Sequence, residues 1–142
     1  MQLLRFVSYY RAGERFNAAG EHAQAIAAFN TALKLDPSFI EKSTRKRIYF
    51  YHEIAKAESG LGNYQEAIAL YRKILNQDSN NSRAHRRLAD LYAQTASDND
   101  KQTLQEAWRC MEKYFELVSD CKNCVKEEDR DFAELLKKRI AK

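Results

Sequence analysis

The 142-residue sequence has few of the residues that interrupt regular structure, with only one proline and four glycines. This scarcity argues against an architecture of many tight turns, because Gly and Pro supply the backbone conformations that such turns need. No apolar run reaches the ~20 residues of a membrane-spanning helix, so we expect no span. Apolar residues nevertheless make up 44% of the chain, which excludes disorder as its main state.

Cysteines and net charge are also low. The three cysteines are Cys110, Cys121 and Cys124. An odd number fits poorly with a closed disulfide framework and is typical of a reducing compartment. The first residues lack the apolar core of a secretory signal, so we expect a cytoplasmic protein. A net charge of +4 is too small to predict nucleic-acid binding by itself.

The sequence repeats itself. When it is shifted by 42 residues, the segment 20–27 (GEHAQAIA) falls on the segment 62–69 (GNYQEAIA). A third and weaker copy contains Ala107 and Trp108. Each copy follows a stretch whose apolar residues recur at spacings of three and four, which places them on one face of a helix. The pattern therefore predicts a helix–turn–helix unit that occurs three times.

These units resemble the tetratricopeptide repeat, a 34-residue motif with small, aromatic, Gly and Pro residues at fixed positions. In the first copy, residues 6–39, the residues at all seven motif positions are Gly13, Phe16, Gly20, Ala25, Phe29, Ala32 and Pro37. The second copy, residues 48–81, keeps Ala55, Gly62, Ala67 and Tyr71. The third, residues 82–119, matches less well and carries an insertion near 96–102.

The resemblance implies one all-α domain over residues 1–142, a right-handed superhelix of three helix–turn–helix repeats. We expect close contacts of Gly13 with Ala25 and of Ala55 with Ala67, since only small side chains let the paired helices approach. Residues 40–47 are expected to extend the first helix of the second repeat backward, the alternative being a start capped at Ser43 or Thr44. The amphipathic segment 125–141 predicts a C-terminal capping helix.

No pattern predicts catalysis. The histidines are scattered, and neither a phosphate-binding loop nor a nucleophile elbow is present, so we expect a non-enzymatic protein without a cofactor. Cys121 and Cys124 form a CxxC pair. With Cys110 they could contribute to a zinc site, but no matching second ligand pair exists. We therefore favour a polar turn whose cysteines partly pack inward.

The resemblance also implies that the first helices of successive repeats line a concave groove for a peptide or protein. The expected groove residues are Tyr10, Glu14, Asn17, Tyr49, His52, Glu53, Lys56, Arg83, Arg86, Arg87 and Asp90. The three arginines favour a ligand with an acidic stretch, because a guanidinium pairs bidentately with a carboxylate. The predicted function is therefore that of an adaptor, scaffold or co-chaperone-like module.

Some members of this family bind the C-terminal carboxylate of heat-shock chaperones through a clamp. Arg83 and Arg87 match its basic pair in the third repeat. Tyr10, Glu14 and Glu53 do not match its other positions, and the two carboxylates would repel a terminal carboxylate.

Two other functions stay open from the sequence. Self-association would use the apolar residues Phe39, Ile40 and Phe50 as a dimer face. Binding of RNA or another polyanion would use the basic run 45–47 together with the aromatic residues that follow it. We rank both below peptide binding, because the aromatic residues also occupy core positions of the second repeat.

Overall fold

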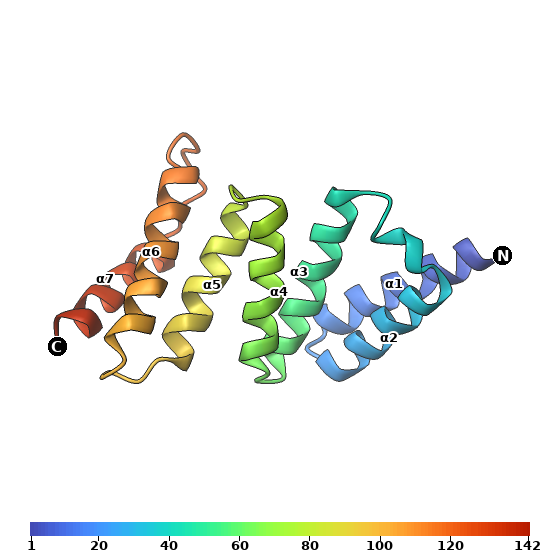
Figure 1. Cartoon of the computed structure of the whole chain (residues 1–142), viewed down its shortest axis with the longest axis horizontal. Helices are drawn as coiled ribbons and strands as arrows, with labels where there is room; N and C mark the ends of the chain where they lie inside the picture. Colours follow the sequence, from blue (N-terminus) through green and yellow to red (C-terminus); the bar gives the residue numbers. More distant parts are fainter. The chain divides into compact units, whose positions relative to one another are not determined.

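The computed structural model describes all residues 1–142 and consists of helices without strands, which confirms the predicted all-α class. The helices are α1 (Gln2–Ala18), α2 (His22–Leu35), α3 (Thr44–Gly60), α4 (Tyr64–Gln77), α5 (Ser82–Thr95), α6 (Lys101–Leu117) and α7 (Glu127–Ala141), with a short 3-10 helix, η1 (Pro37–Phe39) (Figure 1). No helix is long and apolar enough to cross a membrane. The chain divides into two compact units, Met1–Gln77 and Asp78–Lys142, which we call unit 1 and unit 2.

Unit 1 contains two helical hairpins, α1–α2 and α3–α4, each closed by a glycine turn (Figure 1). Gly20 and Gly62 stand in these turns with φ of 78° and 81°. This left-handed conformation is costly for a residue with a Cβ atom and open to glycine. The glycines that align in the sequence therefore mark the two places where the chain reverses direction.

The core of unit 1 is built on aromatic rings and small residues. Phe29 and Phe50 lie with ring centroids 5.5 Å apart and are 0% and 2% exposed. Ala25, Ala55 and Ala67 are fully buried. Gly13 is buried against Phe29, since a Cβ atom at position 13 would lie only 2.6 Å from a ring carbon. A small residue is thus needed at position 13 because an aromatic ring of α2 occupies the space beside it.

The segment before α3 differs from the main sequence prediction. Residues 40–43 form a turn, and α3 begins at Thr44. Ser43 is the N-cap, with an extended backbone and a side-chain oxygen that accepts from the amide of Lys46 at 3.4 Å. The backward extension is thus present over residues 44–47 and was wrong for 40–43, and the alternative start capped at Ser43 is confirmed, because the extended Ser43 backbone ends the helical path.

The apolar residues suggested for self-association mostly belong to the core of unit 1. Phe50 is 2% exposed, and Phe39 and Ile40 pack against the cluster formed by Phe29 and Phe50. The sequence predicted an outward face because it gave no sign of the short 3-10 helix η1. This helix brings Phe39 and Ile40 against the core. These three residues do not form an exposed dimer face.

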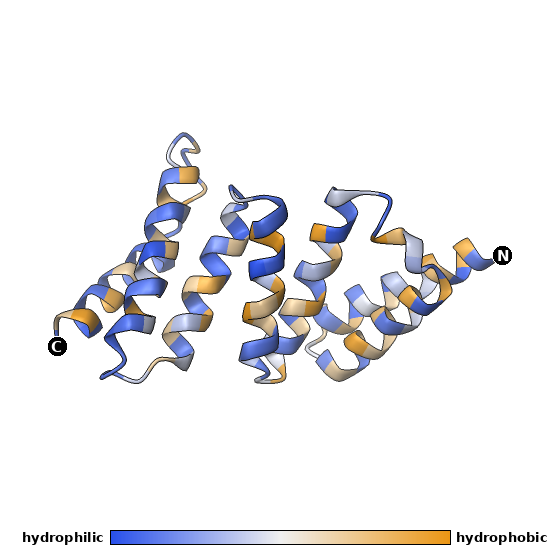
Figure 2. Ribbon diagram, in the orientation of Figure 1, coloured by the Kyte–Doolittle hydropathy of each residue, from blue (hydrophilic) through white to orange (hydrophobic).

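Unit 2 is a hairpin of α5 and α6 against which α7 packs. The buried apolar residues of α7 are Ala133 and Leu136, and they join Leu104 and Met111 of α6 in one apolar core. Figure 2 shows apolar and polar residues alternating along these helices, as expected where one face is buried and the other is exposed. This core fixes α7 on the end of the last hairpin.

Arg139 adds polar contacts near the end of α7. Its Nη1 and Nη2 atoms donate to the carbonyls of Ala93 and Ala96 at 2.7 and 2.9 Å. These carbonyls lie near the C-terminus of α5, where backbone acceptors lack helical partners. Arg139 therefore supplies hydrogen-bond donors to the last carbonyls of α5. Its positive charge is also favourable at the negative end of the α5 helix dipole.

Gly13→Ala is expected to destabilise the protein by roughly 1–3 kcal/mol, as is usual when atoms are added to a filled core. The added methyl group would meet the ring of Phe29, which cannot move away because it is fully buried. Urea denaturation followed by circular dichroism measures the change. A variant as stable as the parent would contradict the close contact, since Ala is otherwise the better helix former.

Candidate functional site

In unit 1, Asn17 and Glu53 hold α1 against α3. Asn17 is 3% exposed. Its Nδ2 donates to the backbone carbonyl of Glu53 at 2.8 Å and to Glu53 Oε2 at 3.0 Å. Its Oδ1 lies 3.3 Å from Nδ1 of His22. A buried amide with these partners has a structural role, so the positions expected to contact a ligand are here used within the protein.

The aromatic residues and the histidine expected in the groove of unit 1 also contact other residues of the protein. The hydroxyl of Tyr49 donates to Glu14 Oε1 at 2.9 Å. Tyr10 packs against Phe29, with ring centroids 5.7 Å apart, and burial together with the nearby Glu14 carboxylate raises the pKa of its phenol. His52 is 7% exposed and meets the ring of Tyr71 edge-on. Of the groove residues expected in unit 1, only Lys56 and Tyr49 are classed as exposed.

In unit 2, Arg86 is an internal tie between α5 and α7. Its Nη1 lies 2.5 Å from Asp90 Oδ1, and its Nε lies 2.6 Å from Asp129 Oδ1. Its guanidinium also covers the ring of Phe132, 4.7 Å from the ring centroid. Sequence spacing places Arg86 with Arg83 and Arg87, but its donors already have carboxylate partners. Arg86 and Asp90 therefore form an ion pair within the protein, and neither is a free contact for a ligand.

Asp129 connects this ion pair to the loop before α7. Its Oδ2 accepts from the backbone amide of Lys126 at 3.1 Å and lies 2.9 Å from the hydroxyl of Tyr114. Burial raises the pKa of Asp129, but the hydrogen bonds from Arg86, Lys126 and Tyr114 outweigh it and lower the pKa below 3.8. The carboxylate is thus held in its charged form.

The sequence reasoning missed Asp129 and Tyr114. Asp129 stands at the third helical position of α7, where an acidic residue can accept a backbone amide and cap the helix. That local signal was available, because three acidic residues begin this segment. Its pairing with Arg86, 43 residues earlier, has no local signal and depends on how α7 packs.

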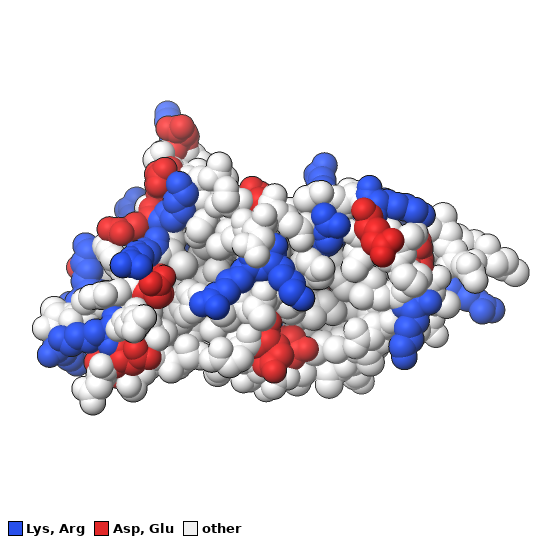
Figure 3. All heavy atoms as spheres, in the orientation of Figure 1, with Lys and Arg blue, Asp and Glu red and all other residues white.

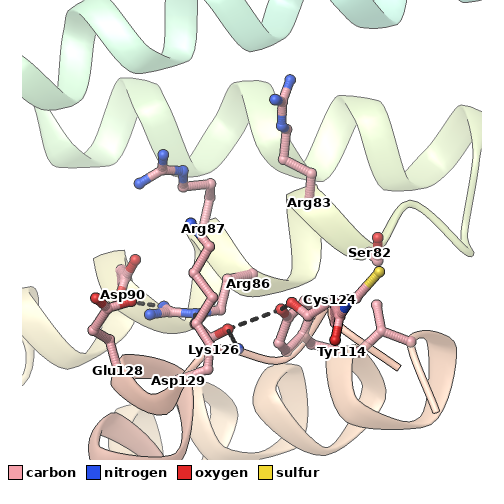
Figure 4. Close-up of a pocket in the computed structure, with 12 residues that line it drawn as sticks. Ser82, Arg83, Arg86, Arg87, Asp90, Tyr114, Cys124, Lys126, Glu128 and Asp129 are labelled. Atoms are coloured by element: carbon pink, nitrogen blue, oxygen red, sulfur yellow. Dashed lines mark hydrogen bonds and ion pairs between the residues drawn. The ribbon is translucent and has the colours of Figure 1, made fainter. Parts of the chain in front are cut away.

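A pocket of about 670 Å³ opens between α5, the end of α6 and the start of α7. Arg83 and Arg87 line it from α5, Lys126 from the loop before α7 and Glu128 from the start of α7. Figure 4 shows Arg83 and Arg87 rising from α5, away from the bonded pair of Arg86 and Asp129. Both are exposed, and neither guanidinium has an ion-pair partner. The pocket therefore presents cationic groups that are available to an anionic ligand.

The cysteines are placed differently from the prediction. Cys121 and Cys124 are joined by a disulfide in the loop before α7, and both are exposed, so the expected inward packing was wrong. Cys110 packs instead against the core of unit 2. No group of three or more His, Cys, Asp or Glu side chains is arranged to hold a metal ion. Disulfide sulfurs also lack the thiolate form that binds zinc.

The basic run 45–47 does not form a continuous cationic surface. Arg47 donates from Nε to Gln77 Oε1 at 2.6 Å and from Nη1 to the carbonyl of Ile40 at 3.2 Å. Lys46 lies over the ring of Phe39, and Arg45 is exposed. Figure 3 shows acidic and basic side chains interspersed over the visible face. Internal partners thus occupy two of the three cations on which polyanion binding would depend.

Two family models describe segments of this chain, and both are tetratricopeptide repeats. One matches residues 7–39, which include most of α1 and all of α2, and the other matches residues 60–100, which include α4 and α5. These segments contain the glycine turns and buried small residues described above. The chain belongs to the tetratricopeptide repeat family.

Solved structures show the same fold. The first tetratricopeptide repeat domain of Spaghetti (RPAP3), bound to the HSP90 peptide SRMEEVD, matches with a TM-score of 0.72 and 15% identity, over 98% of this chain and 95% of that one. The TPR2B domain of yeast Sti1, in a complex with Hsp70, gives 0.65 and 18%, over 97% of each chain. A type III secretion complex from Aeromonas hydrophila gives 0.61 and 18%, over 96% and 78%. No curated protein sequence matches the chain.

Asn17→Ala is expected to destabilise the protein by roughly 1–3 kcal/mol, because it removes the two hydrogen bonds that this buried amide donates to Glu53 of α3. Lys56→Ala, which changes an exposed residue of α3, serves as the control and should change stability by less than about 0.5 kcal/mol. Thermal or urea unfolding compares the two. Equal effects would contradict a structural role of the Asn17 hydrogen bonds.

Asp129→Asn is expected to lower the free energy of unfolding by roughly 2 kcal/mol at pH 7, since it weakens charge-assisted hydrogen bonds. The pKa of Asp129 is lower in the folded protein than its ordinary 3.8, so below pH 3.8 the unfolded chain binds a proton that the folded one still excludes. The stability that this carboxylate contributes is therefore present above pH 3.8 and is lost as the pH falls through the folded pKa. Urea unfolding of parent and variant from pH 7 to 2 should show the difference shrinking on acidification, and a constant difference would refute this role.

Proposed function

We propose that this protein is a non-catalytic protein-interaction module that binds an acidic peptide in the pocket of unit 2. One observation carries the proposal. Arg83 and Arg87 line a pocket in which the nearby carboxylates of Asp90 and Asp129 are already paired with Arg86. The internal pairing leaves the two exposed guanidinium groups to an external anion.

The arrangement of the two arginines suits carboxylates. They stand four residues apart on α5, so they lie about 6 Å apart along the helix axis and on the same face. Each guanidinium offers a planar pair of donors that matches a carboxylate. Because α5 is held by the core of unit 2, little rearrangement is needed when a ligand binds.

The comparisons support a peptide as the ligand. The similar domain of Spaghetti (RPAP3) is bound to SRMEEVD, whose last four residues include three acidic side chains and the C-terminal carboxylate. The similar domain of Sti1 is in a complex with Hsp70. By analogy of fold, an adaptor or co-chaperone-like role follows for this chain, in which unit 2 recognises an acidic segment of a partner protein.

The test is fluorescence anisotropy with labelled SRMEEVD and with SRMQQVN carrying a C-terminal amide, which has the same length without acidic groups. The parent should bind SRMEEVD at least about tenfold more tightly, because the pocket offers unpaired cations. Arg83→Glu combined with Arg87→Glu should remove this preference and leave helical content and melting unchanged, since both residues are exposed.

The control is Arg45→Glu combined with Lys122→Glu, which makes the same change of charge at exposed residues outside the pocket. It should bind SRMEEVD nearly as the parent does. Equal affinities of the parent for the two peptides, or equal losses in the two double variants, would contradict an acidic-peptide site at Arg83 and Arg87.

A further inference from the structure

We propose that Lys126, from the loop before α7, is a third cationic contact of this site, so that the site selects a segment with two neighbouring acidic side chains. The proposal rests on the proposed function and names its ligand class. Lys126 lines the same pocket as Arg83 and Arg87 and is exposed without an ion-pair partner. It comes from a different element than the two arginines, the loop before α7, whereas they stand on α5.

Although Lys126 precedes α7 in a loop, its backbone position is fixed. Its amide donates to Asp129, which is bonded to Arg86 of α5. The hydroxyl of Tyr114, on α6, lies 3.0 Å from the carbonyl of Cys124 and 2.9 Å from Asp129 Oδ2. The loop is thus connected both to α5 and to α6. These contacts make Tyr114 and Asp129 positioning residues for the Lys126 side chain.

The charges around the pocket define the ligand. The carboxylates of Asp90 and Asp129 are paired with Arg86, so the lining cations without a partner are Arg83, Arg87 and Lys126. Two of them stand on one helix and the third comes from the loop before α7, which suits one acidic group held by the arginines and a second reaching the ammonium group. A ligand with a single acidic side chain leaves Lys126 without a partner.

Glu128 places a negative charge in the same pocket. It lines the pocket next to Lys126 and is exposed without an ion pair. A carboxylate at this pocket repels negative charge, so Glu128 lowers the affinity for an acidic ligand. Lys126 and Glu128 therefore act in opposite directions on the same ligand.

The main experiment compares Lys126→Gln with the parent on SRMEEVD, SRMQEVD and SRMEQVD, by anisotropy. Lys126→Gln should weaken binding of SRMEEVD about fivefold, as expected for one partly solvated charge contact. For one of the two peptides that keep a single Glu, the same substitution should have almost no effect, because the Glu side chain that meets Lys126 is already absent. Lys122→Gln, in the same loop but outside the pocket, is the matched control and should bind all three as the parent does.

An equal effect of Lys126→Gln on all three peptides would show long-range attraction instead of a contact and would overturn the proposal. So would a loss no greater than that of the Lys122→Gln control. In either case, loss of binding in the Arg83 and Arg87 double variant would leave the proposed function standing. Absence of SRMEEVD binding by the parent refutes both.

Two further comparisons test the surrounding residues. Glu128→Gln should strengthen binding of SRMEEVD by a few-fold, whereas Glu127→Gln, outside the pocket on the same helical turn, should not. Tyr114→Phe should weaken binding in the parent but have no further effect in the Lys126→Gln background, because it acts through the placement of Lys126. A Tyr114→Phe effect of the same size in both backgrounds would assign it a merely structural role.

Discussion

The interaction on which unit 2 depends is the pairing of Arg86 with two carboxylates, Asp90 on its own helix and Asp129 on α7. The side chains of Arg86 and Asp129 are 20% and 10% exposed, so both charges are largely removed from water. Removing one partner from such a pair leaves a charge without compensation, which makes the arrangement strongly interdependent. Through Asp129 the same pair reaches the loop before α7 and Tyr114 of α6. One guanidinium thus links the last hairpin, its capping helix and the wall of the pocket.

The two units use equivalent helix faces in opposite ways. In unit 1, the polar residues on the faces of α1 and α3 bond to each other, as Asn17 does with Glu53 and Tyr49 with Glu14. In unit 2, Arg86 satisfies the nearby acidic side chains, and Arg83 and Arg87 keep their donors exposed. Which polar groups remain unpaired on these helix faces is therefore decided by their neighbours in the folded chain. The repeat motif fixes only the buried small and aromatic positions. It does not specify which polar side chains stay unpaired.

The loop between α6 and α7 is held at several points and also lines the pocket of unit 2. Cys121 and Cys124 close it by a disulfide, Tyr114 and Asp129 bond to its backbone, and Lys126 extends its charge to the pocket. A short loop held at several points loses little conformational freedom on binding a ligand, which favours affinity. The capping helix thus does more than cover the apolar end of the last hairpin.

The sequence by itself determined the helical hairpins and their core. The spacing of apolar residues, the glycines at 20 and 62, and the small residues at 13, 25, 55 and 67 are local signals, because helix periodicity and turn conformation depend on near neighbours. It also placed Arg83 and Arg87 together, since residues four apart on a helix share a face. Only the tertiary structure decided that Arg86 pairs with Asp129, that Asn17 and Glu53 bond to each other, and that Lys126 lines the same pocket as the two arginines. Each of these depends on contacts between residues 36 to 43 positions apart in the chain or on the packing of α7, and no local pattern encodes such distances.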